Sequence, residues 1–335
     1  MSEYLETINA MKKRYKIAAV TKDWLGFPLP IFKVGGREEP AALVVAGASG
    51  IEVASVYAAF ELLVQVDIER TTYILPSRDP AGLHSMSFVL GKLLGTDVNV
   101  ETADEARSIL AGSGAEVVLD DEEVFLALIK GIGVAIGKGL DAFGTVNALR
   151  ARLKEGLAES LESTRVLVAS QLSQVEGVGE LGRFATVFVH EGDVLTYDDV
   201  DRAEIPEVSF VRDFIDKVEL GLVIDLHESK SAEFYALTGS APSSTENTIL
   251  YVVLDQIRSR GLRIASADQL KTMGLVAAED GIAYGRGSCG LISYASSKAY
   301  AMAFVAPLVE PLEVRSRALA TAALSALNAY IVASV

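Results

Sequence analysis

Residues 39–50, EPAALVVAGASG, form a short apolar run bounded by proline and glycine, a pattern typical of a buried strand. Helical periodicity follows from residue 51 to about residue 66. Residues 71–75 (TTYIL) then indicate a second strand, which ends at the loop 76–82 (PSRDPAG). Strand, helix and strand at this spacing predict a βαβ unit with a parallel sheet.

The rest of the chain divides into a stretch with an irregular hydrophobic pattern and a stretch that returns to the α/β pattern. Residues 91–206 mix acidic, glycine-rich and helical patterns, including a helical pattern at 146–161, and we expect them to form an insertion or subdomain. A helix around 210–218 and a buried strand at 220–226 (LGLVIDL) then return to the α/β pattern. The predicted domains are therefore residues 1–90 together with 207–335, and the inserted residues 91–206.

The composition indicates a packed protein and excludes several classes of partner. Half of the 335 residues are hydrophobic, which supplies enough apolar material for a core. A net charge of −15 repels phosphate backbones and anionic lipid, so we expect no nucleic acid and no membrane as partner. A single cysteine, Cys289, excludes an intrachain disulfide and any multi-cysteine metal site.

The two ends of the sequence bear on location and assembly. Residues 1–16 are polar and charged, without the apolar stretch of a signal peptide. Residues 318–335 are uncharged but rich in alanine, and we expect a buried helix there or one used in self-association, which allows a homo-oligomer. Together with the single cysteine, these features predict a cytoplasmic protein.

The polar residues that follow the predicted strands are the strongest functional signal. His227 comes at the end of the buried strand in VIDLHESK, two residues after Asp225. Glu52 begins the helix after the first strand, and Arg78 follows the second. Because ligands of open α/β sheets gather at the carboxyl ends of strands, we expect these side chains to meet in one crevice. The alternative is that Glu52 only favours the helix N-terminus electrostatically.

The motifs GASGIE, LPSRDPAG and IDLHE, in this order, resemble the zinc carboxypeptidase superfamily, nearest the branch of succinylglutamate desuccinylases and aspartoacylases. The resemblance covers roughly residues 41–82 and 220–315. It implies an α/β fold of three layers, α/β/α, with a mixed, largely parallel sheet. It also implies zinc as cofactor and hydrolysis of a C-terminal peptide or N-acyl amino acid amide bond in a small-molecule or peptide substrate.

The family binds zinc through a His-x-x-Glu motif and a later histidine, and the matching positions here are Ser49, Glu52 and His227. Ser49 thus occupies the position of a missing ligand, because a neutral hydroxyl binds zinc poorly compared with imidazole or carboxylate. His84, just beyond the DPAG loop, is a candidate substitute ligand. Asp225 is expected to orient His227 through its carboxylate, by accepting a hydrogen bond from the ring nitrogen that does not bind the metal.

The resemblance also places a general base near the C-terminus, for which Glu310 in FVAPLVEPLEVR is the nearest candidate. The register of the family places Ala306 or Pro307 there instead. Arg78 is a candidate for binding a substrate carboxylate by its chemistry rather than by its family position. The alternative to a zinc hydrolase is a relative that has lost metal chemistry and has a binding or assembly role.

Two further patterns indicate other chemistry. Residues 46–50 (AGASG) with Tyr294 and Lys298 resemble a short-chain dehydrogenase that binds NAD(P). However, Glu52 would direct a carboxylate toward the cofactor pyrophosphate. The run 131–139 (GIGVAIGKG) lacks the first glycine and the final Ser/Thr of a phosphate loop, so we expect a flexible turn there.

Overall fold

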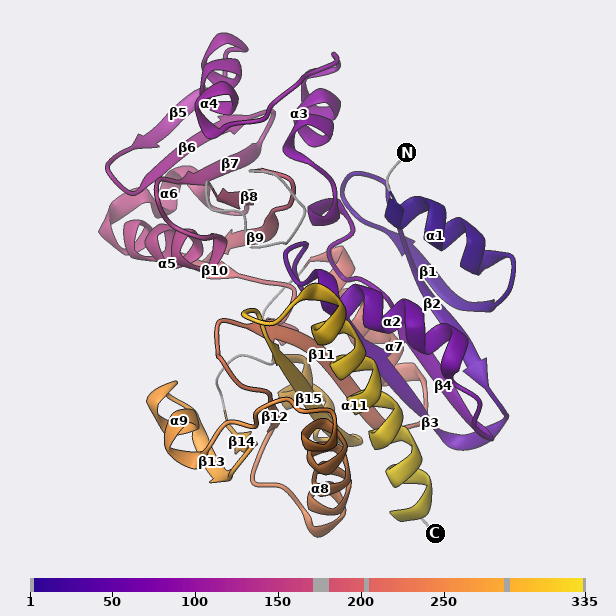
Figure 1. Cartoon of the computed structure of the whole chain (residues 1–335). Helices are drawn as coiled ribbons and strands as arrows, with labels where there is room; N and C mark the ends of the chain where they lie inside the picture. The colour runs from indigo at the N-terminus through magenta and orange to yellow at the C-terminus, as the bar shows by residue number, and fades with distance from the viewer. Residues whose placement is uncertain (1–2, 171–180, 202–204, 286–289, 334–335) are drawn as a thin grey trace.

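The computed structural model describes residues 3–170, 181–201, 205–285 and 290–333. Cys289 lies outside these residues. Two β-sheets organise the described chain, and the smaller one lies to one side of the larger, at the upper left of Figure 1.

Within the described residues, nine strands form the main sheet, in the order β1-β2-β4-β3-β11-β15-β12-β14-β13. The four central strands β4, β3, β11 and β15 run parallel to one another, while β1, β2 and β13 pair antiparallel at the flanks. The strands are β1 (Lys16–Lys22), β2 (Pro28–Gly35), β3 (Glu38–Val45), β4 (Arg70–Leu75), β11 (Leu220–Ser229), β12 (Tyr235–Thr238), β13 (Val276–Glu279), β14 (Ile282–Tyr284) and β15 (Tyr300–Pro307). The sheet is thus mixed with a parallel centre, as the sequence predicts.

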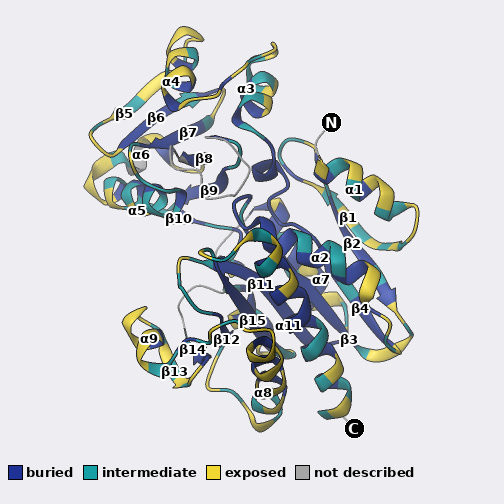
Figure 2. Cartoon of the chain, viewed as in Figure 1, coloured by how far each residue is buried: buried dark blue, intermediate teal, exposed yellow. Residues whose placement is uncertain are grey.

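Helices cover both faces of the main sheet and complete three layers. One face carries α1 (Glu3–Lys12), α2 (Val53–Gln65), α8 (Ser244–Ser259) and α11 (Leu312–Ala333), whose apolar side chains share one core. The other face carries α7 (Pro206–Lys217), α9 (Ala267–Thr272) and α10 (Gly290–Ala295), which pack in a second core. Figure 2 shows the central strands buried between helices whose outer surfaces are exposed. The α/β/α fold predicted from the sequence is confirmed.

The C-terminal helix α11 packs against α2 and α8, and its alanines allow this close approach because they project little beyond the backbone. This agrees with the expectation of a buried helix over the uncharged C-terminal stretch. Among the described helices, none combines the length and apolarity needed to cross a bilayer.

The second sheet is built from strands between residues 116 and 195, in the order β10-β9-β8-β7-β6-β5. All neighbouring strands are antiparallel except β7 and β8. Helices α3 and α4 share a core with one face, and α5, η2 and α6 lie on the other. These elements are α3 (Met86–Leu94), α4 (Ala103–Gly112), β5 (Glu116–Asp120), β6 (Val124–Ile129), β7 (Ile132–Gly137), α5 (Ala142–Arg152), η2 (Leu153–Leu157), α6 (Ala158–Leu161), β8 (Arg165–Ser170), β9 (Ala185–His190) and β10 (Asp193–Leu195).

The structure of the glycine-rich run 131–139 differs from the one expected from the sequence. Its residues Ile132–Gly137 form strand β7 in the middle of the second sheet, where we expected a flexible turn. Gly133 has a packing reason, because a Cβ there would lie 2.9 Å from a methyl carbon of Val166 on the neighbouring strand. The helical pattern at 146–161 is present but interrupted at Gly156, whose φ of 119° is not helical.

A buried acid gives the fold a measurable pH dependence. Oδ1 of Asp23 accepts hydrogen bonds from the backbone N–H groups of Leu25 and Phe27, at 2.9 and 2.8 Å. Burial nevertheless raises the pKa of Asp23 from 3.8 to about 7. Since the folded state holds this proton more tightly than the unfolded chain, its stabilising contribution is present below pH 4 and lost as the pH rises through 7.

We therefore expect Asp23→Asn to reduce the fall in thermal unfolding midpoint between pH 5 and pH 8. The amide oxygen can still accept the two backbone hydrogen bonds, but the side chain no longer titrates. Asp97→Asn, at an exposed position, makes the same charge change and should leave the fall as in the wild type. Equal pH dependence in both variants would show that Asp23 does not contribute.

Candidate metal site

Two polar loops and the end of a strand meet beside the parallel centre of the main sheet. Strand β11 lies between β3 and β15, and β3 also pairs with β4, so the carboxyl ends of these strands lie on one edge. The loop after β3 carries Ser49 and Glu52, and the loop after β4 carries Arg78 and Asp79. His227 lies near the end of β11. The predicted crevice is therefore formed by parallel pairing of strands that are far apart in the sequence.

His227 lies between two carboxylates. Its Nδ1 is 3.3 Å from Glu52 Oε1, and its Nε2 is 2.9 Å from Asp225 Oδ2. His227 and Glu52 are 5% and 6% exposed, and Asp225 is fully buried. Glu52 Oε2 is also buried and has no hydrogen-bond partner among the described residues. A carboxylate oxygen without a donor is costly in such a place, so this pocket favours a cation.

The protonation of the imidazole follows from these contacts. The negative charge of Asp225 favours a proton on Nε2, which leaves the lone pair of Nδ1 facing Glu52. A lone pair and a carboxylate repel each other at 3.3 Å unless a positive charge lies between them. A second proton on the ring or a bound cation would each remove this repulsion.

Glu52 is free for this role because another acid serves the helix end. Oε2 of Glu228 accepts a hydrogen bond of 2.7 Å from the backbone N–H of Ala54, in the first turn of α2. Glu228 Oε1 is in turn paired with Arg315 of α11 at 2.6 Å. Glu52 makes no capping hydrogen bond to its own helix. Glu228, rather than Glu52, therefore makes the side-chain hydrogen bond to the first turn of α2.

The buried guanidinium of Arg78 pairs with two carboxylates of the site. Arg78 is 2% exposed, and its two terminal nitrogens each lie 2.8 Å from a carboxylate oxygen, one of Asp225 and one of Asp198. Burial opposes ionisation of Asp225, but Arg78 and His227 outweigh it and hold the pKa of Asp225 below its usual value. Both terminal nitrogens of Arg78 are thus paired with carboxylates of the chain, and its role in binding a substrate carboxylate stays a prediction.

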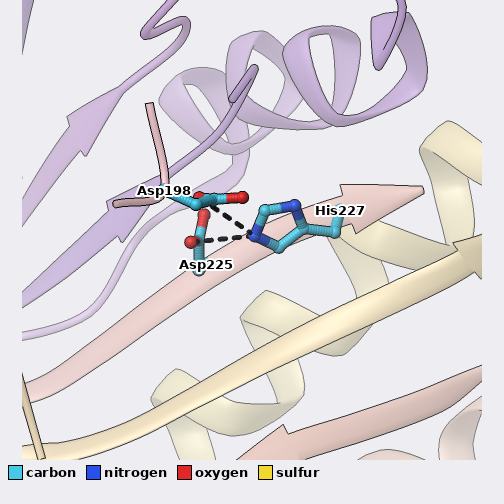
Figure 3. A group of neighbouring side chains, drawn as sticks. All are labelled: Asp198, Asp225 and His227. Atoms are coloured by element: carbon cyan, nitrogen blue, oxygen red, sulfur yellow. Dashed lines mark ion pairs between the residues drawn. The ribbon is translucent and has the colours of Figure 1, made fainter. Parts of the chain in front are cut away.

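Asp198 is a member of the site that our sequence analysis missed. Its Oδ1 lies 3.8 Å from His227 Nε2, and Figure 3 shows Asp198 and Asp225 facing the same ring nitrogen. Burial raises the pKa of Asp198 to about 6, although Arg78 and His227 lower it. Asp198 lies beyond β10, in the stretch without family resemblance, and only a contact across the fold reveals it.

Asp79 joins the loops of the site to the second sheet. Its carboxylate accepts hydrogen bonds from the backbone N–H groups of Gly50 and Gly82, both at 3.0 Å. It also accepts from the backbone N–H and the hydroxyl of Thr186 on β9, at 3.0 and 2.8 Å. A Cβ at Gly50 would lie 2.1 Å from the backbone of Gly82, so the close approach of the two loops requires glycine.

A cavity of about 960 Å³ opens beside these residues, between the main sheet and the second sheet. Ser49, Glu52 and Asp198 line it from the main-sheet side. Other lining residues include Phe143, Arg150, Thr186 and Tyr294. The cavity is large enough for a small molecule or a short peptide end.

Other histidines and the predicted base lie elsewhere. His84 is buried against Phe27 and Phe88, with ring centroids 4.0 and 4.8 Å away, and does not line this cavity. Nδ1 of His190 lies 3.3 Å from a carboxylate oxygen of Glu162, in a half-exposed pair on the second sheet. Glu310 is in the turn after β15 and is not among the lining residues described.

The residues of the dehydrogenase-like pattern make contacts within the chain. Tyr294 donates a 2.6 Å hydrogen bond to Asp216, and Lys298 pairs with the same carboxylate. The backbone N–H of Gly50, in the turn that would hold a pyrophosphate, donates to Asp79. This turn therefore already serves a carboxylate of the chain.

Two faces of His227 could hold a metal ion. On the Nε2 face, Asp198, Asp225 and His227 offer ligand atoms within 4.8 Å of one another, but Arg78 already binds both carboxylates there. On the Nδ1 face, Glu52 and His227 offer an oxygen and a nitrogen 3.3 Å apart. Two tetrahedral zinc ligands about 2.1 Å from the ion lie roughly 3.4 Å apart. The Nδ1 face therefore fits zinc better, with Ser49 as a weak neighbour on the same cavity wall.

Comparisons with known proteins give only distant similarity. No protein-family model matches the sequence, and no curated protein matches it. Solved structures that resemble the chain include a metallo-carboxypeptidase of Pseudomonas aeruginosa, at 12% identity over 98% of this chain and 68% of that one, with a TM-score of 0.46. A metallo-carboxypeptidase of Burkholderia cenocepacia matches at 13% identity over 100% and 70%, with a TM-score of 0.46. Carboxypeptidase A of Helicoverpa armigera matches at 13% over 99% and 71%, with a TM-score of 0.45.

The buried ion pairs of Arg78 can be tested by denaturant unfolding. Arg78→Met leaves Asp225 and Asp198 without their guanidinium, and we expect a loss of about 3–5 kcal/mol in the free energy of unfolding. Arg150→Met is the matched control, because the pair of Arg150 with Asp193 is more than one-third exposed and should contribute at most about 1 kcal/mol. Similar losses in both variants would contradict a central role for Arg78.

Proposed function

We propose that this protein is a metal-dependent hydrolase of amide bonds, with zinc held by Glu52, which lines the large cavity, and by His227, which lies next to Glu52. The observation that carries the proposal is the 3.3 Å approach of Glu52 Oε1 to His227 Nδ1, with Glu52 Oε2 buried and without a donor. The substrate class follows the resemblance in sequence: a C-terminal peptide or N-acyl amino acid amide, as in the desuccinylase and aspartoacylase branch.

Zinc in such a site polarises a carbonyl and lowers the pKa of bound water. The chain itself supplies orientation and proton transfer. Asp225 holds the imidazole of His227 from the Nε2 side at 2.9 Å. Asp198 lines the cavity with a pKa raised by burial to about 6, which suits a group that takes up a proton near neutral pH. We assign the role of general base to Asp198, because Glu310 does not line the cavity.

The alternative function is binding or assembly without a metal. It is favoured by Ser49, which leaves the Nδ1 face with two strong ligands, and by Arg78, which places a permanent cation on the Nε2 face. In that case His227 carries both protons and bridges Glu52 and Asp225 as an imidazolium. Metal content distinguishes the two functions directly.

Metal analysis of protein purified from zinc-supplemented cells should find about one zinc per chain. His227→Ala should lose it, because one of the two strong ligands is removed, whereas His190→Ala at the half-exposed pair should retain it. Ser49→His adds a third strong ligand and should raise zinc affinity at least tenfold, or about 1.4 kcal/mol. Absence of zinc in the wild type and in Ser49→His would exclude the hydrolase.

The pH profile tests the role of Asp198. Only the ionised carboxylate can accept a proton, so the rate of amide hydrolysis should rise between pH 5 and pH 7, through the pKa of about 6. Asp198→Asn should lower the rate at least a hundredfold, within the about 10²–10⁴-fold range of general base catalysis. Asp201→Asn, an exposed residue of the same cavity wall, should retain the wild-type profile. A profile unchanged in Asp198→Asn would assign the base elsewhere.

A further inference from the structure

A second cavity lies on the other side of the first turns of α2. Its volume is about 350 Å³, and the two cavities share no lining residue within the described part of the chain. Val53 and Val56 of α2 form one wall, and Tyr4 of α1 and the segment with His84 form others. The volume is near the lower end of the about 300–1,000 Å³ typical of ligand pockets, which indicates a small ligand.

Aromatic rings make up much of this pocket. His84 stacks against both Phe27 and Phe88, with interplanar angles of 15° and 22°. Burial, with a smaller effect from Arg183, lowers the pKa of His84 to about 4, so the imidazole is neutral at physiological pH. Tyr57 and Phe60 add further rings to the lining. The body of the ligand is therefore expected to be apolar, since these walls offer mainly carbon surface.

Arg183 supplies a cation to this apolar lining. The guanidinium of Arg183 donates to the backbone oxygen of Gly182 at 2.9 Å, but its Nε is buried without a hydrogen-bond partner among the described residues. Burial lowers the pKa of Arg183, which records an unfavourable loss of hydration. Glu3, the one acid among the lining residues that the structure describes, already accepts a 2.9 Å hydrogen bond from the hydroxyl of Tyr57. An incoming carboxylate would supply the acceptor that Arg183 Nε lacks.

We propose that this pocket binds a small monocarboxylate with an aromatic or aliphatic body. Its carboxylate accepts hydrogen bonds from Arg183, while its body packs on Phe88, Val53 and Val56. The pocket is not part of the proposed metal chemistry, so the two proposals can fail independently. Because Glu52 directly precedes Val53, the ligand would nevertheless contact the helix that positions a metal-site residue.

Calorimetry with phenylacetate tests this site in the full chain. We expect saturable binding of phenylacetate and none of phenylacetamide, which has the same body without the charge. Arg183→Gln should weaken binding at least tenfold, because it removes the charge-assisted hydrogen bonds. Glu3→Gln keeps an acceptor for Tyr57 but removes a nearby negative charge, and should strengthen binding about two- to fivefold.

Two controls locate the binding. Arg150→Gln removes a cation from the large cavity and should leave phenylacetate affinity unchanged. His227→Ala should also retain it, which separates this pocket from carboxylate binding at a metal ion. Wild-type protein that binds neither phenylacetate nor hexanoate at about 10 mM would overturn the proposal. So would equal affinity in Arg183→Gln, provided that its thermal unfolding shows an intact fold.

Discussion

Four hydrogen bonds that converge on the carboxylate of Asp79 hold the site together. Two come from the loops after β3 and β4, and two come from Thr186 on the second sheet. Burial raises the pKa of Asp79 to about 6, and these donors oppose that rise. The carboxylate is thus costly to bury and strongly bound once buried, so the three segments that satisfy it are fixed relative to one another. The walls of the large cavity depend on this arrangement.

The charged groups around His227 fall into separate ion pairs with different roles. Glu228 and Arg315 stabilise the start of α2, which leaves the carboxylate of Glu52 for the imidazole. The guanidinium of Arg78 balances the negative charges of Asp225 and Asp198. Glu228, Asp225 and Asp198 are therefore each paired with an arginine. The carboxylate of Glu52, on the Nδ1 face of His227, is the one of this group that still needs a positive charge beside it. This distribution of partners, more than any single ligand, supports a cation there.

The sequence predicts the fold and part of the site for identifiable reasons. The apolar run before Gly47 and the run before His227 each describe a strand buried on both faces, and parallel pairing then brings Glu52 and His227 together. Asp198 could not be found in this way, because no periodic pattern connects its loop to β11. The role of Arg78 was also hidden, since sequence does not show that two carboxylates surround it. The domain limits and the oligomeric state remain predictions.

The large cavity has a further property that follows from its lining. Glu52, Asp198, Asp199 and Asp201 contribute carboxylates, against the single guanidinium of Arg150 among the described lining residues. Field lines from such a wall are focused in a recess of low dielectric constant, so cationic molecules are drawn in, and the carboxylate-bearing substrates proposed above would enter against this field. Added salt would therefore slow the entry of amines and speed the entry of free acids. Diffusional selection thus begins at the entrance, before any contact with His227.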